Sequence, residues 1–210
     1  MHIADGILPA GLTIGSHVAS GIVLVLTTKN AEKQEIPKIS LFTAMFFIAS
    51  LIHIPIPPTS VHLVLCGLIG IILGKYSFSA IWVGLLFQAI MFQHGGILSL
   101  GVNALNFGIP ALLSYLIFNL FKKRFKNSNF LAFLAAIISF AAIILAAFLL
   151  SIELYITEKS FSLLITGFLI GTAVTAIIDA IIAFFVIKIL NKYYPYMLNN
   201  QKKTGESQTG

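Results

Sequence analysis

The first two residues, Met1 and His2, carry the most specific metal chemistry in the chain. A free α-amine can bind a metal ion once it has lost its proton, and the His2 amide nitrogen can close a five-membered ring with it. The His2 imidazole closes a six-membered ring with the same amide, so two residues supply three nitrogens in one plane. A fourth nitrogen completes a square, which suits Ni²⁺ or Cu²⁺ and not tetrahedral Zn²⁺.

This chemistry needs an uncut N-terminus, and the sequence predicts one. Met1–Leu8 contains no Lys or Arg, so it lacks the basic start of a cleavable signal peptide. Because His2 is bulky, we also expect the initiator Met1 to be retained.

Other histidines could supply the fourth nitrogen, since imidazole is the commonest biological metal ligand. His2, His53, His62 and His94 are all expected at the ends of apolar spans that share one rim, whereas His17 lies deep within a span. Taken singly, each could be an interfacial polar residue. Their convergence on one face makes them a candidate site.

Two turns are expected to position these groups. Three prolines between Ile54 and His62 predict a stiff, extended outer turn. We expect Thr59 or Ser60 to cap the following helix, with His62 in its first turn. Such a turn would hold His62 over the N-terminus with little entropy left to lose on binding.

The second turn contains Gly95-Gly96, which permits close backbone approach. Asn103 and Asn106 follow within an apolar span, and we expect them to orient the ligands from behind. Asp5 is expected to shape the N-terminal turn through local hydrogen bonds.

The elements that carry these residues are membrane helices. Of the 210 residues, 58% are hydrophobic and only 10% are charged, against about 25% charged in soluble domains. The chain is therefore predicted to be an all-α, polytopic integral membrane bundle, because lipid-exposed open sheet edges cannot be satisfied in hydrocarbon. The net charge is +6, but the basic residues lie between apolar spans and not on one folded basic face, which argues against nucleic acid as a partner.

About seven transmembrane helices are expected, each approaching the roughly 20 apolar residues that a span requires. They are Ile7–Thr28, Ile39–Ile54, Thr59–Gly74, Ser77–Phe92, Leu98–Phe121, Phe130–Ser151 and Phe161–Leu190. Residues 1–198 are predicted to form a single transmembrane metal-binding domain, and residues 199–210 a disordered cytosolic tail.

Basic residues predict the orientation of these spans. Seven spans leave Lys159 alone on one side of the membrane and all other Lys and Arg residues on the opposite side. The positive-inside rule then places the N-terminus outside and the C-terminus in the cytosol, in a multi-pass protein of the inner (cytoplasmic) membrane.

Three ordered blocks of the sequence resemble one known family. They are Met1-His2-Ile3-Ala4-Asp5-Gly6, the run from Ile54-Pro55-Ile56-Pro57 to Thr59-Ser60-Val61-His62, and the run from Phe87-Gln88-Ala89 through Gly95-Gly96-Ile97 to Asn106. They resemble the substrate-binding components of nickel and cobalt energy-coupling-factor (ECF) transporters, over most of the first half of the chain.

The resemblance implies that the Met1 amine, the His2 amide and imidazole, and the His62 imidazole hold the metal. It implies a non-enzymatic subunit that captures Ni²⁺ or Co²⁺ for ATP-driven uptake, such as cobalt supply for cobalamin biosynthesis. The implied partners are a coupling transmembrane subunit and two ATP-binding subunits, with room for a small accessory membrane subunit.

The choice between Ni²⁺ and Co²⁺ stays open at this stage. The His62 block resembles the nickel branch of the family, whereas a histidine at position 94 resembles the cobalt branch. His94 is accordingly expected to be an additional ligand or a residue that orients one.

Small residues recur every four positions at Gly11, Gly15 and Ala19, a spacing that lets helices approach closely. They could pack within the bundle or dock the coupling subunit. Asp179, inside the last span, is expected to be structural or to couple movements, with His17 as one possible hydrogen-bond partner.

Other functions remain as alternatives. A metal- or haem-dependent membrane enzyme could use the same histidines, and a stand-alone carrier could move the ion without partners. The run Gly70-Ile71-Ile72-Leu73-Gly74-Lys75 is one residue too short between its glycines for a phosphate-binding loop. No nucleotide site is therefore expected in this chain.

Overall fold

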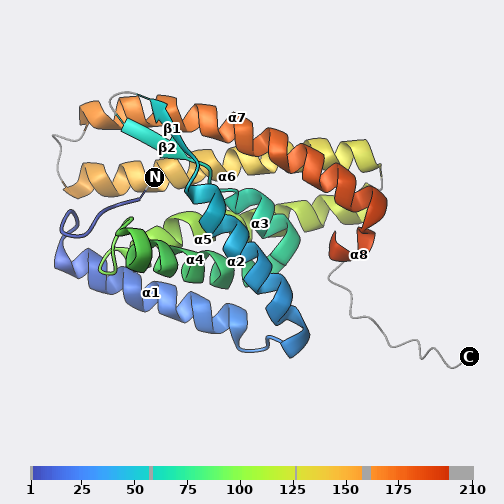
Figure 1. The fold of residues 1–210 in the computed structure, drawn as a ribbon, viewed down its shortest axis with the longest axis horizontal. Helices are drawn as coiled ribbons and strands as arrows, with labels where there is room; N and C mark the ends of the chain where they lie inside the picture. Colours follow the sequence, from blue (N-terminus) through green and yellow to red (C-terminus); the bar gives the residue numbers. More distant parts are fainter. Residues whose placement is uncertain (1, 57–58, 126, 158–161, 199–210) are drawn as a thin grey trace, which may run out of the picture.

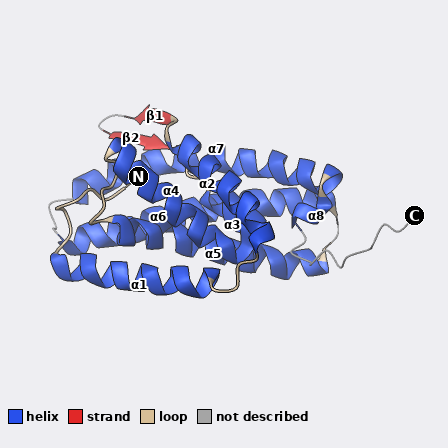
Figure 2. Ribbon diagram, turned by 60° about the horizontal axis from the view of Figure 1, so that its bottom comes forward, coloured by secondary structure: helices blue, strands red, loops and turns tan. Residues whose placement is uncertain are grey.

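The structure, a computed structural model, describes residues 2–56, 59–125, 127–157 and 162–198. This part of the chain is helical apart from one short hairpin (Figures 1 and 2). In chain order the elements are α1 (Ala10–Thr28), the 3₁₀ turn η1 (Lys33–Glu35), α2 (Ile36–Ser50), β1 (His53–Ile56), β2 (Thr59–His62), α3 (Cys66–Leu73), the 3₁₀ turn η2 (Gly74–Tyr76), α4 (Ser77–Phe92), α5 (Leu100–Arg124), α6 (Ser128–Thr157), α7 (Ser162–Tyr193) and α8 (Pro195–Leu198).

The long helices α1, α5, α6 and α7 run roughly along the long axis of the molecule, and α6 packs extensively against α7 (Figure 1). Helix α5 is central, because it contacts α1, α3, α4 and α6. Every residue of α3 is buried, as expected of a short helix that is apolar on all faces. The core therefore extends from α3 into α5 and α6.

The outer surface of the bundle is strongly apolar. Leu120 is 69% exposed and Ile14 65%, and they are accompanied by many other exposed aliphatic and aromatic side chains. Soluble monomers rarely expose apolar patches on this scale. Five stretches within the described residues are long and apolar enough to cross a membrane: Ala10–Thr28, Cys66–Phe92, Leu100–Arg124, Ser128–Thr157 and Gly171–Tyr193.

The fold is therefore a membrane-type helical bundle, as predicted. The second stretch, Cys66–Phe92, is divided by the turn at Gly74, where φ is +61°, so that it comprises α3 and α4. Helix α2, with 15 residues, is shorter than these stretches. The number of crossings and the orientation in the membrane stay predictions.

Six of the seven predicted helices are confirmed with small shifts in their ends, as α1, α2, α4, α5, α6 and α7. The third prediction, a helix over Thr59–Gly74, is wrong in its first half. Thr59–His62 forms strand β2, which pairs antiparallel with β1 so that His53 lies opposite His62. The prolines and β-branched residues here favour extended backbone over helix.

The start of α3 accordingly differs from the prediction. Helix α3 begins at Cys66, so His62 is not in its first turn and neither Thr59 nor Ser60 caps it. The residue before the helix is Leu65, with φ of +55°, in the left-handed region that non-glycine residues rarely adopt. Its N–H donates to Asp179 Oδ2 at 2.9 Å.

Asp179 is therefore a structural residue that ties α7 to the β2–α3 junction, and it is 1% exposed. The predicted partnership with His17 is wrong. His17 lies on α1, where its Nδ1 is 3.0 Å from the Thr13 carbonyl oxygen and its Nε2 is 3.1 Å from that of Ile97. Both ring nitrogens are thus engaged away from α7.

Close helix contact at Gly101 fixes α1 against α5. A Cβ at this position would lie 2.6 Å from the His17 backbone nitrogen, so only glycine fits. With the His17–Ile97 hydrogen bond, this contact holds α1 against the α4–α5 connection. That connection carries Gly95 and Gly96, which the sequence predicted to permit close approach.

Candidate metal site

The N-terminal segment is held against α5 by a paired hydrogen bond. The Ile3 N–H donates to Asn103 Oδ1 at 2.9 Å, and Asn103 Nδ2 donates to the Ile3 carbonyl oxygen at 3.0 Å. Both are buried, and the Ile3 side chain is 1% exposed, packed with Leu8, Val102 and Leu150. A chain end that is usually mobile is therefore fixed from its third residue.

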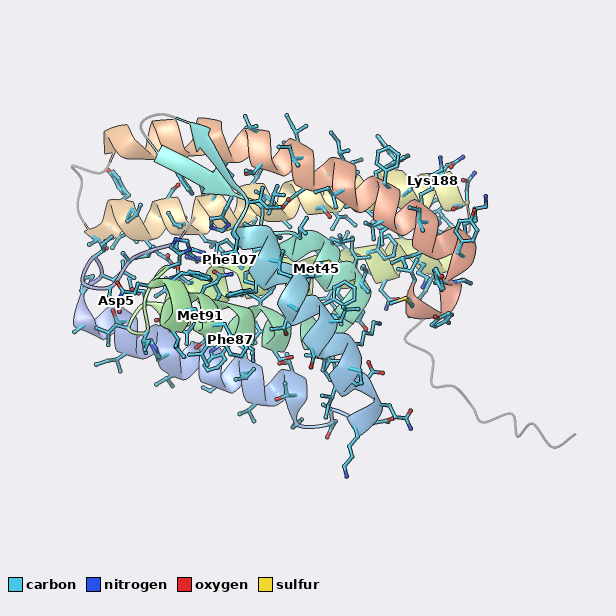
Figure 3. All side chains as sticks on the ribbon, viewed as in Figure 1. Asp5, Met45, Phe87, Met91, Phe107 and Lys188 are labelled. Carbon is cyan, nitrogen blue, oxygen red and sulfur yellow. The ribbon has the colours of Figure 1, made fainter. Side chains whose placement is uncertain are left out.

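A second pair of bonds fixes the next two residues. Asp5 Oδ1 accepts from the Ser99 N–H at 2.8 Å, and Ser99 Oγ donates to the Ala4 carbonyl oxygen at 3.0 Å. Asp5 also lies directly against Gly96, where a Cβ could not fit. The predicted role of Asp5 in shaping the N-terminal turn agrees with these contacts, and Figure 3 shows it at the end of the bundle opposite Lys188.

These bonds bring the His2 and His62 rings together. Their centroids lie 4.7 Å apart with an interplanar angle of 22°. Two imidazoles that bind one ion in adjacent positions, with metal–nitrogen bonds of about 2.0–2.1 Å, have ring centres about 4.5 Å apart. The two predicted histidine ligands therefore have a separation that suits a shared metal ion.

The floor under His2 is aromatic. The Phe107 ring, labelled in Figure 3, meets the His2 ring edge to face with centroids 5.4 Å apart. The Phe46 ring lies 6.4 Å from that of Phe107. His62 is 3% exposed, and its Nδ1 is 3.1 Å from the Leu63 carbonyl oxygen. The site is thus partly shielded from water, which strengthens electrostatic interactions within it.

The third imidazole, His94, lies on the turn between α4 and α5. Its ring centroid is 6.4 Å from that of His2. Gln93, Gly95 and Gly96 have φ of +53°, +79° and +99°, so the turn has a defined left-handed path that its glycines favour. A Cβ on Gly95 would lie 3.3 Å from His2 Cβ, which means that the turn backbone itself packs on His2.

Met1, and with it the predicted amine ligand, lies outside the described residues. Within the described residues, no three His, Cys, Asp or Glu side chains are arranged to hold a metal ion. The predicted set does not need such a group, because two of its four nitrogens are the Met1 amine and the His2 amide.

Asn106 hydrogen-bonds to Glu153, a residue that the sequence analysis did not identify as functional. Its Nδ2 donates to Glu153 Oε2 at 2.7 Å, and the Asn106 side chain is 2% exposed. Glu153 was expected beyond the sixth span, but α6 continues to Thr157. The apolar residues Ile152 and Leu154 flank Glu153, and they were the sequence feature that could have indicated a longer helix. The orienting role of Asn106 stays a prediction.

Gln88 is a buried polar side chain that the sequence analysis did not identify. It is fully buried on α4, and neither amide atom has a hydrogen-bond partner among the described residues. Gln88 lies on the same face of α4 as Gly84, one turn earlier, and Gly84 packs on Phe46. An amide within the apolar run Ser77–Phe92 was the sign that could have identified it, since buried amides are normally bonded.

The remaining sequence-predicted residues lie away from the ligands. His53 is opposite His62 in the hairpin, and its side chain is outside the described set. Gly11 and Gly15 are exposed on α1, where a Cβ at either would meet nothing within 4 Å, and Ala19 is half-buried. The two glycines therefore do not pack within the bundle.

Replacing Asn103 with Ala should release the N-terminal segment. The variant loses both bonds to Ile3, each contributing about 0.5–1.5 kcal/mol, so amide exchange at Ile3 should accelerate by roughly 10- to 100-fold. Hydrogen–deuterium exchange with mass spectrometry measures it. Asn119→Ala, at the other end of α5, is the control. Unchanged protection of the N-terminal peptide would contradict the assignment.

Comparison with known proteins gives a consistent result. The family model described as "Cobalt uptake substrate-specific transmembrane region" matches residues 2–197. A Haemophilus influenzae protein named for metal transport is 32% identical over 206 residues, covering 95% of this chain and 97% of that protein. A cobalt transport protein of Clostridium tetani is 30% identical over 210 residues, covering 92% and 85% respectively.

A solved structure agrees with the fold. The crystal structure of a truncated transition metal transporter superposes with a TM-score of 0.80 at 25% identity, covering 91% of this chain and 99% of that one. The relatives are named as transport proteins, and the family match over residues 2–197 includes the N-terminal segment from His2, the hairpin and helices α1 to α7. The chain therefore belongs to the CbiM family of cobalt-uptake transmembrane proteins.

Proposed function

We propose that this chain captures Co²⁺ or Ni²⁺ at the outer face of the membrane, through the Met1 amine, the His2 amide and imidazole, and the His62 imidazole. The observation that carries this proposal is the pairing of His2 with His62 at 4.7 Å, beneath an N-terminal segment fixed at Ile3. The name of the Clostridium tetani relative supports cobalt as one cargo.

The proposed chemistry explains why the segment is held so firmly. Two fused chelate rings form only if the amine, the amide nitrogen and the imidazole share a plane. The bonds from Asn103 and Ser99 order the backbone directly after His2, so less conformational entropy is lost on binding. Because each donor must give up its proton to bind, capture should weaken as the pH falls.

The charge distribution supports an outside N-terminus. Asp5, in the N-terminal segment that carries His2, lies at one end of the bundle and Lys188 at the other (Figure 3). The ammonium groups of Lys38 and Lys122 donate to the carbonyl oxygens of Met197 and Leu198 in the C-terminal helix α8, which lies toward the same end as Lys188 (Figures 1 and 3). Positive charge on the cytosolic side follows the usual rule for proteins of the cytoplasmic membrane.

We further propose that seven helices cross this membrane, and that residues 1–198 act as a single capture domain without catalytic activity. In this scheme a coupling membrane subunit and two ATP-binding subunits supply the energy, with a small accessory membrane subunit allowed. The resemblance to ECF substrate-binding components supports this arrangement. The transport names of the relatives favour it over an enzyme.

Substitution of His62 tests the ligand set. His62→Phe keeps a ring against His2 but removes the nitrogen, so Co²⁺ and Ni²⁺ affinity should fall by more than about 100-fold, beyond the 10- to 100-fold typical of outer-shell losses. Isothermal titration of the purified full chain measures it. His17→Gln, a histidine outside the site, should bind as the unmodified chain does. Equal affinities in all three proteins would exclude His62 as a ligand.

The stripe of Gly11, Gly15 and Ala19, whose two glycines are exposed, is the proposed docking face for the coupling subunit, since small residues allow close helix approach. Gly15→Leu should abolish co-purification with the partner subunits while leaving metal affinity unchanged. Gly21→Leu, on the same helix but off the stripe, is the matched control, because a Cβ there also meets nothing within 4 Å. Intact co-purification of Gly15→Leu would show that docking uses another face.

A further inference from the structure

Helices α6 and α7, which run side by side (Figure 1), leave a groove on their outward surface. The groove has a volume of about 400 Å³, and all of its lining side chains are apolar. Its smallest lining residues are Ala136 on α6 and Ala180 on α7, and the exposed rings of Phe140 and Phe185 border them. This surface faces lipid in a membrane bundle, so the groove can hold an acyl chain.

One face of α7 leads from this groove to a positive charge. Ile177, Ile181 and Phe184 line the groove at spacings of three or four residues, so they share one face of the helix. Lys188, four residues after Phe184, continues this face, and its ammonium nitrogen lies 5.6 Å from the centre of the Phe184 ring. The lysine is therefore in contact with a residue that lines the groove.

The groove and the lysine together span one leaflet of a bilayer. Ile177 and Lys188 are separated by roughly 16 Å along the helix axis, at about 1.5 Å per residue. Half of the hydrocarbon core of a membrane is roughly 15 Å thick. Lys188 is exposed near the end of α7 (Figure 3). With its ammonium group among the lipid headgroups, the far end of the groove lies near the middle of the bilayer.

The charge on Lys188 is not neutralised by the two helices that form the groove. Asp179, the acidic residue of α7, is buried and accepts a hydrogen bond from the Leu65 N–H. The adjoining part of α6, Ser128–Phe140, contains no acidic residue. Lys192 lies one turn beyond Lys188 on the same helix. Positive charge therefore gathers at the open end of an apolar groove.

We propose that the α6–α7 groove binds an anionic phospholipid, with one acyl chain against Ile181 and Phe184 and the phosphate at Lys188. Basic residues at the ends of membrane helices bind anionic headgroups in this way. Because surrounding lipid is as apolar as the groove, the chain adds close packing and the ammonium group provides the preference for an anionic lipid. This site is separate from the metal site and does not depend on the proposed metal capture.

A helix of a partner subunit is the other occupant to consider. Close contact between membrane helices uses runs of small residues. Here the two alanines, Ala136 and Ala180, are bordered by the rings of Phe140, Phe184 and Phe185. These rings keep a helix backbone away from the alanines, whereas a thin, flexible acyl chain fits between them. The shape of the groove therefore favours a lipid.

The experiment uses the full chain, delipidated in detergent. Native mass spectrometry measures the binding of palmitoyl-oleoyl phosphatidylglycerol, which is anionic, and of the phosphatidylcholine with the same acyl chains, which is zwitterionic. Lys188→Gln removes the charge, and Ala180→Phe and Ala136→Leu fill the groove from its two sides. Lys75→Gln is the matched control, because the Lys75 ammonium also lies over a ring, 4.9 Å from that of Tyr76.

The control lysine is remote from the groove. The Tyr76 hydroxyl donates to the carbonyl oxygen of Asn30, just after α1, and α1 and α7 lie on opposite sides of the bundle in both ribbon views (Figures 1 and 2). Thermal unfolding of each variant shows that it is folded. Two groove variants are used, so that one still reports on the groove if the other does not fold.

The unmodified chain should bind the anionic lipid about five-fold more tightly than the zwitterionic lipid, the scale of one lysine at an anionic surface. Lys188→Gln should lose this preference, and Lys75→Gln should keep it. The groove variants should weaken the binding of both lipids. Free glycerol phosphate, which has the charge but no acyl chain, should not displace the lipid.

Three results would overturn the proposal. The first is equal binding of the two lipids to the unmodified chain, or an undiminished preference in Lys188→Gln. The second is displacement by glycerol phosphate, which would indicate an anion site that does not use the groove. The third is unchanged lipid binding in the folded groove variants. If these variants also fail to co-purify with the coupling subunit, the groove is a docking site for a partner helix.

Discussion

The site depends on one constraint: the end of a polypeptide chain must be held still inside a helical bundle. Chain ends are ordinarily mobile, and a chelate built from an amine and its neighbouring amide is useful only if its backbone is ordered. The paired bonds between Asn103 and Ile3 meet this requirement, because they satisfy both the donor and the acceptor of a buried backbone unit. The hydrogen bonds from Ser99 to Ala4 and Asp5 fix the next two residues as well.

Helix α5, the hairpin and the α4–α5 turn surround the N-terminal segment and the rings beside it. The central helix α5 carries both Asn103 and Phe107, so one element supplies the bonds and the aromatic floor. The hairpin delivers His62 from one side, anchored at its base where Asp179 accepts from Leu65. The turn with Gly95 and Gly96 closes the other side. Helix α5 fixes the segment that carries His2, the hairpin carries His62, and the turn carries His94, although these elements lie far apart in the sequence.

Much of this could be predicted from sequence, for identifiable reasons. Long apolar runs have few alternatives to helix in a bilayer, which is why α1, α5 and α7 were expected nearly at their observed limits. The segment Thr59–His62 was misassigned because apolar content alone does not separate a short strand from a helix end. Long-range partners, such as Glu153 for Asn106, could not be foreseen, since hydropathy carries no information about which polar groups meet.

Metal titration after inserting three residues, Leu-Ser-Leu, between Met1 and His2 tests most directly whether the N-terminus binds the metal. Leucine keeps the initiator in place, and three residues avoid the chelating tripeptide that a single insertion would create. With a C-terminal tag, the unmodified chain should bind one Co²⁺ or Ni²⁺ ion tightly, and the insertion should abolish that binding while thermal stability is kept. Unchanged binding after the insertion would contradict the account, and the ligands would have to be sought among His53, His62 and His94.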